Sequence, residues 1–180
     1  QVLDEIYAEI QQYYGKGKVA DYIPALSKVP PDQFGMALRT IDGQEFSVGA
    51  AQKNFSIQSI SKLFVLTMAM IHTDSDRWER VGREPSGTAF NSLVQLEQEN
   101  GRPRNPFINA GAIVMTDFLF DHYQSPREGI LDFIRNQSGN NSITVNDVVY
   151  KSEKETGHRN YALAHFMKSY GNINHEIEDV

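Results

Sequence analysis

The chain has 180 residues, of which 40% are hydrophobic and 22% charged, and its formal net charge at pH 7 is -6. These values predict one globular domain with a substantial apolar core. The acidic balance, with basic residues that form no run, argues against nucleic acid as a partner. Because the sequence contains no cysteine, it has no disulfide framework or thiolate metal site, and any nucleophile would be Ser or Thr.

No membrane or metal signal is found in the sequence. The longest apolar stretch, residues 63–71, is too short to cross a bilayer, and the N-terminus has no signal-peptide pattern. The five histidines do not have the spacing of a metal site. We therefore predict a cytoplasmic protein that requires no metal and binds no membrane.

The first predicted elements are a helix and a hairpin. Apolar residues recur at helical spacing from Val2 to Tyr13, and Gly15 ends this pattern. Residues 34–41 and 44–49 flank Asp42-Gly43, a dipeptide typical of tight turns, and predict two antiparallel strands. Since a lone hairpin is marginally stable, the chain has fewer strands than a sheet usually needs.

The next predicted helix begins at residues Gln58-Ser59-Ile60-Ser61-Lys62 and continues as an apolar run to Ile71. A spacing of three places Ser59 and Lys62 on one face, and a helix that is apolar on all sides is expected to be buried. Burial disfavours the charged form of Lys62, so its amine could accept the Ser59 proton at the positive end of the helix dipole. A capping Ser and an outward-facing Lys would give the same pattern, and these residues alone leave both interpretations open.

The rest of the chain is predicted to be mainly helical. Helices are expected around Trp78, through residues 113–120, from 126 to about 137, and over about 145–155 and 159–170. Ser125-Pro126-Arg127-Glu128 predicts a capping box with Pro at the first helical position, and Gly139 and Gly171 are predicted terminators. Asn174 is predicted to cap one more helix, whose apolar stripe starts at Ile173.

Several blocks of sequence carry a resemblance to a known family: residues 17–24, 55–62, 84–92 and 104–112, followed in order by Ser152-Glu153 and Arg159-Asn160. This pattern resembles the serine-dependent glutaminases, which belong to the serine beta-lactamase and penicillin-binding superfamily. The resemblance implies an α+β fold with a helical subdomain and an antiparallel sheet that is incomplete in this chain. It covers only a little more than the first half of the family's catalytic domain. We therefore expect residues 1–180 to be a truncated single catalytic domain, with the N-terminal helix and hairpin in 1–56 and a mainly helical part in 57–180.

The resemblance also implies a chemistry. Ser59 would attack the side-chain amide of L-glutamine, Lys62 would accept its proton, and hydrolysis of the acyl-enzyme would give L-glutamate and ammonia without a metal or cofactor. The family pattern assigns substrate-binding roles to Tyr22, Gln58, Asn109, Glu153 and Asn160. From the residues alone, the two asparagines could instead be helix caps, Tyr22 a cover for the core, Glu153 part of a solvated helix face and Gln58 a surface residue. Family members commonly form homodimers or homotetramers, so a homo-oligomer is expected.

Two other functions remain possible on the sequence. A beta-lactamase or penicillin-binding acyltransferase shares the Ser-x-x-Lys pair, although no Ser-Asp-Asn triplet follows the helix here. A non-catalytic fragment that acts only in assembly is the second alternative.

Overall fold

The computed structural model describes residues 2–72 and 77–180. The chain divides into two compact units, of which unit 1 comprises Gln1–Ser56 and Asn146–Thr156, and unit 2 comprises Ile57–Val145 and Gly157–Val180. Within the described residues, no helix is both long enough and apolar enough to span a membrane.

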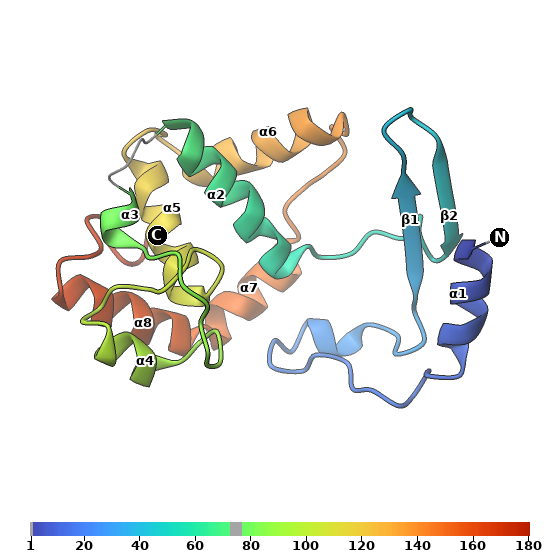
Figure 1. The fold of residues 1–180 in the computed structure, drawn as a ribbon, viewed down its shortest axis with the longest axis horizontal. Helices are drawn as coiled ribbons and strands as arrows, with labels where there is room; N and C mark the ends of the chain where they lie inside the picture. The colour runs from blue at the N-terminus through green and yellow to red at the C-terminus, as the bar shows by residue number, and fades with distance from the viewer. Residues whose placement is uncertain (1, 73–76) are drawn as a thin grey trace. The chain divides into compact units, whose positions relative to one another are not determined.

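Unit 1 contains the predicted N-terminal helix and hairpin. Helix α1 covers Val2–Gln11, and strands β1, Gly35–Arg39, and β2, Glu45–Gly49, pair antiparallel with Gly35 opposite Gly49 (Figure 1). The hairpin prediction is confirmed, and the backbone N–H of Gly43 closes the turn by donating to the Thr40 carbonyl at 3.0 Å. No residue of α1, β1 or β2 is buried, since the sheet has only two strands in the described part of the chain and α1 packs against β2.

Two further segments of unit 1 are helical. A short 3-10 helix, η1, covers Leu26–Lys28, and helix α7 covers Asp147–Thr156. The backbone N–H of Ala25 donates to the Ser152 hydroxyl at 3.1 Å, which joins the segment after Ile23 to a helix 127 residues further along the chain. Ile23 is only 2% exposed and provides an apolar anchor for this segment.

Unit 2 is built around helix α5, Asn109–Phe120, which packs against α2, Ser61–His72, and α8, His158–Ser169 (Figure 1). The unit also contains α3, Arg77–Arg80; α4, Leu93–Gln98; and α6, Pro126–Ser138. Val114, Met115 and Leu119 of α5 are at most 1% exposed. Side chains from α2, α4 and α8 meet them, so α5 is the centre of the core.

The helix that follows the Ser-x-x-Lys motif differs from its prediction in two respects. Residues Gln58–Ile60 form a 3-10 helix, η2, and the α-helix begins only at Ser61, after Gln58 with its positive φ of 44°. The expectation of burial on all sides is also wrong, since Leu63 and Ile71 are 53% and 64% exposed. Helices α5 and α6 cover one side of α2, and the opposite side carries exposed apolar side chains.

Local signals in the second half of the chain were partly correct. Helix α6 begins at Pro126 and ends before Gly139, which has the left-handed φ of 65° expected of a terminator. The predicted capping box is not formed, however, because the Ser125 side chain makes no capping hydrogen bond. Helix α4, which the sequence analysis missed, is capped by the Ser92 hydroxyl accepting from the Gln95 N–H at 3.3 Å.

The helix predicted to start at Asn174 is absent. Both backbone N–H groups at the expected start, those of Asn174 and His175, donate to the carboxylate of Asp117 at 2.9–3.2 Å. These N–H groups bond to a side chain of α5 and not to the Asn174 side chain that was expected to cap them. Residues 176–180 form a single turn, in which the Val180 N–H donates to the Glu176 carbonyl. Ile173 and Ile177 are nevertheless buried, at 4% and 7% exposure.

Candidate active site

The Lys62 ammonium group is the centre of a polar cluster in unit 2. Lys62 lies in the first turn of α2 and is half-buried. Its Nζ donates to the side-chain oxygen of Asn109 at 2.7 Å and to the backbone carbonyl of Phe107 at 3.1 Å. Desolvation by burial lowers the pKa of Lys62, as predicted from the sequence.

A second amide extends this cluster. The Asn109 side-chain NH2 donates to the side-chain oxygen of Asn160 at 3.1 Å. Asn109 is the first residue of α5 and Asn160 the third residue of α8, while the capping positions belong to Ile108 and Gly157. The alternative interpretation of these asparagines as helix caps is therefore not supported.

Three helix starts meet at this cluster, because Lys62, Asn109 and Asn160 all lie in first turns. The helix dipole makes each helix start electropositive. Such an environment disfavours a positive charge on Lys62 and favours negative charge on a ligand or a developing oxyanion.

The loop before α5 delivers the Phe107 carbonyl to Lys62. The Asn105 side-chain oxygen accepts from the N–H groups of Phe107 and Ile108 at 2.9 and 3.1 Å, and its NH2 donates to the Glu84 carbonyl at 2.9 Å. Gly111 allows this loop to lie directly on α5, since a Cβ there would be 1.9 Å from the Asn105 carbonyl oxygen. The sequence analysis did not assign Phe107 or Asn105 to the site, although an Asn-Pro dipeptide just before a helix signals such a turn.

Ser59 lies within η2, three residues before Lys62, and is exposed. Among the described residues, the hydrogen bonds of the Lys62 ammonium go to Phe107 and Asn109, and none joins it to Ser59. Gln58, immediately before Ser59, has a φ of 44°, a conformation that is uncommon for a residue with a side chain. Local strain of this kind is often found beside reactive residues.

The arrangement around Lys62 would leave a neutral amine ready to accept a proton. A neutral lysine amine has two N–H groups and one lone pair, and the oxygens of Phe107 and Asn109 match the two N–H groups. The lone pair is then left unoccupied and can accept a proton. The Phe90 ring is also close to Lys62, with its centroid 6.0 Å from Nζ.

Tyr22 and Glu153 belong to unit 1. Tyr22 is 70% exposed, so it does not cover the core as one interpretation suggested. Glu153 lies on the exposed side of α7, yet neighbouring protein atoms desolvate its carboxyl group enough to raise its pKa. The bond between Ala25 and Ser152 connects the two segments that carry these residues. Their substrate-binding roles remain predictions.

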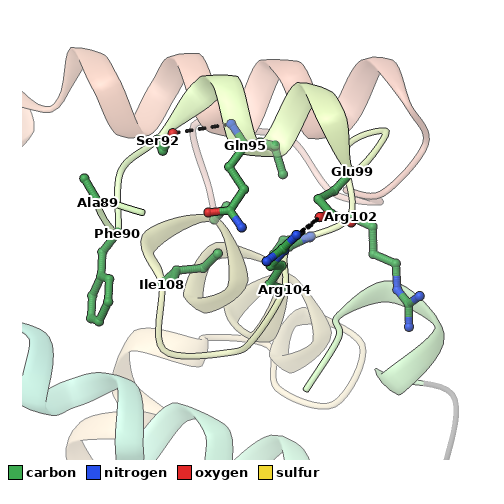
Figure 2. A pocket seen from close by; sticks show the side chains of 11 residues that line it. Ala89, Phe90, Ser92, Gln95, Glu99, Arg102, Arg104 and Ile108 are labelled. Atoms are coloured by element: carbon green, nitrogen blue, oxygen red, sulfur yellow. Dashed lines mark hydrogen bonds and ion pairs between the residues drawn. The ribbon is translucent and has the colours of Figure 1, made fainter. Parts of the chain in front are cut away.

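Two cavities of unit 2 are lined by residues other than those of the Ser-x-x-Lys pair. Figure 2 shows a cavity of about 10 Å³ beside α4, flanked by the Ser92–Gln95 capping bond and the Glu99–Arg104 ion pair. This volume fits about one water molecule and excludes an amino acid. A more open groove of about 390 Å³ is lined by Gly82, Glu84, Pro85, Gly87, Glu99, Arg102, Pro103 and Arg104. Neither cavity is lined by Ser59 or Lys62.

A family model described as Glutaminase matches residues 17–180. The chain belongs to the glutaminase family. A curated glutaminase from Rhizobium rhizogenes is 57% identical over 182 residues, which cover 99% of this chain and 59% of the relative. A glutaminase from Saccharophagus degradans is 54% identical and covers 100% of this chain and 59% of its own length. The chain thus spans about three-fifths of the length of these curated glutaminases.

Solved glutaminase structures share the fold. One described as the probable glutaminase YbaS matches with a TM-score of 0.90 at 31% identity, covering 98% of this chain and 57% of that one. A probable glutaminase from Bacillus subtilis, complexed with 6-diazo-5-oxo-L-norleucine, matches with a TM-score of 0.79 at 30% identity, covering 96% and 52%. The predicted α+β, beta-lactamase-like fold class of the glutaminases is therefore confirmed, with helices and a two-stranded antiparallel sheet in this chain.

Proposed function

We propose that this chain carries the nucleophile and general base of an enzyme that hydrolyses L-glutamine to L-glutamate and ammonia. The observation that supports this most strongly is the desolvated Lys62 amine, held by two oxygen acceptors three residues after Ser59. A lysine base needs a lowered pKa and a fixed orientation, and Lys62 has both features. Membership of the glutaminase family supports L-glutamine as the substrate.

In the proposed reaction the Ser59 hydroxyl oxygen attacks the side-chain amide carbon of glutamine while its proton passes to the Lys62 amine. The carbon–nitrogen bond then breaks, and the leaving nitrogen takes the proton from Lys62 and departs as ammonia. Water attacks the resulting ester with Lys62 again acting as base, which releases L-glutamate and restores Ser59. The Ser59 backbone N–H, at the start of η2, is proposed as one donor to the oxyanion.

Five residues are proposed to bind the amino acid. Glu153 would pair with the substrate ammonium group, and this pairing would offset the desolvation that raises the pKa of its carboxyl. Asn109 and Asn160 would contribute amide groups at the electropositive helix starts, where the substrate carboxylate is favoured. Tyr22 and Gln58 are proposed as further contacts.

A homodimer or homotetramer is the proposed assembly. The exposed apolar side chains on α2, including Leu63, Met70 and Ile71 at 51–64% exposure, support burial of this face against further protein. Light scattering coupled to size-exclusion chromatography would measure the mass of the particle. A monomer at micromolar concentration would contradict this part of the proposal.

The test of the proposed chemistry begins with the intact mass of the protein and ammonia release from L-glutamine on the same sample. Turnover would be measured for this chain and for a chimera. In the chimera, the parts of the Rhizobium rhizogenes glutaminase that do not align with this chain are fused to it. We expect the chimera to release ammonia and its Ser59→Ala variant to be inactive. An active Ser59→Ala chimera would refute the acyl-enzyme assignment.

Covalent labelling then locates the nucleophile. The chimera would be incubated with 6-diazo-5-oxo-L-norleucine, and the modified peptide identified by mass spectrometry. Modification of Ser59 is expected, and modification elsewhere would contradict the proposal. Labelling of Ser59 by benzylpenicillin without glutamine turnover would instead indicate the beta-lactamase or penicillin-binding chemistry.

A further inference from the structure

The Asn109 side chain has a polarity that its two neighbours determine. A Lys62 ammonium group can only donate hydrogen bonds, so the Asn109 amide must present its oxygen, at 2.7 Å. The NH2 group of the same amide then points to the opposite side, where the Asn160 oxygen accepts from it at 3.1 Å. Lys62, Asn109 and Asn160 therefore form a directional row of donors and acceptors.

We propose that Asn160 is a positioning residue that acts on Lys62 through Asn109. This assignment rests on the proposed function, in which Lys62 is the base, and it adds to the substrate contact proposed for Asn160. Rotation of the Asn109 amide by half a turn would direct its NH2 group at the Lys62 amine and remove one of the two oxygen acceptors. The Asn160 oxygen opposes that rotation because it would then face the Asn109 oxygen, acceptor against acceptor.

The position of the two asparagines makes this coupling possible. Asn109 begins α5 and Asn160 lies in the first turn of α8, and these two helices pack against each other in the core of unit 2. The backbone N–H of Asn109 is itself fixed by donation to the Phe90 carbonyl at 2.9 Å. With both backbones held, the remaining freedom of Asn109 is the orientation of its side-chain amide.

The pH at which Lys62 titrates should be sensitive to the orientation of the Asn109 amide, because few groups contact its amine. Within the described residues, its ammonium group contacts the oxygens of Phe107 and Asn109 and faces the ring of Phe90, with no carboxylate among these contacts. A change in the orientation of the Asn109 oxygen should therefore alter the stability of the ammonium form directly.

The test is a double-mutant cycle read out by the NMR titration of the Lys62 side chain in the ligand-free 180-residue chain. Asn160→Leu removes the acceptor for Asn109, so the Lys62 titration midpoint is expected to fall by about 0.5 pH unit. In an Asn109→Ala background the same substitution should cause no shift, because the connecting amide is gone. Asn136→Leu, a change of the same kind on the exposed side of α6, is the control and should leave Lys62 unaffected.

Asn160→Asp provides a second variant that retains an acceptor for Asn109. Its carboxylate preserves the polarity of the row and adds negative charge, so the Lys62 midpoint should rise by about one pH unit. Circular dichroism would establish that each variant is folded, and Asn160→Ala, which also removes the acceptor, replaces Asn160→Leu if the latter is not.

Two results would overturn the proposal. One is an unchanged Lys62 titration in Asn160→Leu and Asn160→Asp, which would leave Asn160 as a substrate contact only. The other is an equal shift with and without Asn109, which would mean that Asn160 acts by another route. Because the titration requires no turnover, a chimera that fails to label at Ser59 would refute the proposed function without affecting this result.

Discussion

At the scale of single residues, Lys62 owes its lowered pKa to burial, and its hydrogen-bond partners come from a distant part of the chain. The spacing of Ser59 and Lys62 and the apolar run behind them indicated a desolvated lysine, and burial does lower its pKa. The partners of Lys62 lie 45 and 47 residues away, at Phe107 and Asn109, and Asn160 is 51 residues beyond Asn109. Local periodicity contains no information about contacts over such separations.

Replacement of Lys62 by Arg tests its role as a base. Arginine keeps the positive charge but stays protonated at neutral pH, so it cannot accept the Ser59 proton. Turnover of the chimera is expected to fall by about 10²–10⁴-fold while circular dichroism remains unchanged. Lys53→Arg, at an exposed position of unit 1, is the matched control and should retain activity. Near-normal turnover of Lys62→Arg would show that another group is the base.

At the scale of secondary-structure elements, contacts between segments decided where several helices begin and end. The sequence predicted α6 correctly because Pro126 and Gly139 act locally. It failed at residues 174–180, where the N–H groups of Asn174 and His175 donate to Asp117 on α5 and only a single turn follows. The sequence of residues 174–180 does not indicate that their partner is a fully buried carboxylate on α5, 57 residues earlier in the chain.

The loop that carries Phe107 depends on a glycine in α5. A Cβ at position 111 would lie 1.9 Å from the Asn105 carbonyl oxygen, so Gly111→Ala must displace either the loop or the helix. We expect a loss of about 1–3 kcal/mol in the free energy of unfolding, measured by urea denaturation. Gly17→Ala is the control, because a Cβ at Gly17 meets no atom within 4 Å. Equal stability of the two variants would contradict this close approach.

The buried carboxylate of Asp117 should make stability depend on acid pH. Burial alone would raise its pKa, but the hydrogen bonds from Arg80, His175 and Asn174 together outweigh burial and lower it. A lowered pKa in the folded state means that Asp117 stabilises the protein above its unfolded value of about 4 and loses this contribution as the pH falls through the folded value.

Asp117→Asn should therefore destabilise the chain by about 3–5 kcal/mol at neutral pH, because Arg80 loses its buried partner, and should flatten the acid dependence. Asp132→Asn is the control, since its pair with Arg135 is 3.5 Å long and Asp132 is 69% exposed. That change should cost less than about 1 kcal/mol. Thermal melts from pH 3 to pH 7 would measure both variants. An acid dependence in Asp117→Asn as steep as in the unmodified chain would argue against this role.

At the scale of the whole molecule, the family and fold class were predictable because several sequence blocks match at characteristic spacing. The grouping of α7 with the N-terminal segment was not anticipated, because it depends on contacts such as the one between Ala25 and Ser152, 127 residues apart. The two units also differ in burial. Helix α5 contributes seven buried residues to unit 2, whereas α1, β1 and β2 of unit 1 contribute none.

This difference predicts unequal local stability. Backbone amides of α5 should exchange with deuterium only through global unfolding of unit 2, while amides of β1 and β2 should exchange at least about 100-fold faster through local opening. Hydrogen exchange followed by NMR would resolve both sets. Hairpin amides as protected as those of Val114 and Leu119 would show that unit 1 has stability that its burial does not explain.

The buried Asp117 carboxylate also constrains the order of events during synthesis. The ribosome releases Asp117 after its partner Arg80 but well before its other two partners, because Asn174 and His175 follow it by 57 and 58 residues. Until those residues emerge, the carboxylate lacks the backbone N–H donors that complete its hydrogen bonding, which disfavours closing the core of unit 2 around it. Unit 1 likewise cannot form the hydrogen bond between Ala25 and Ser152 until Ser152 has been synthesised. A nascent chain halted near residue 145 would therefore have both units open and would depend on chaperones for protection from aggregation.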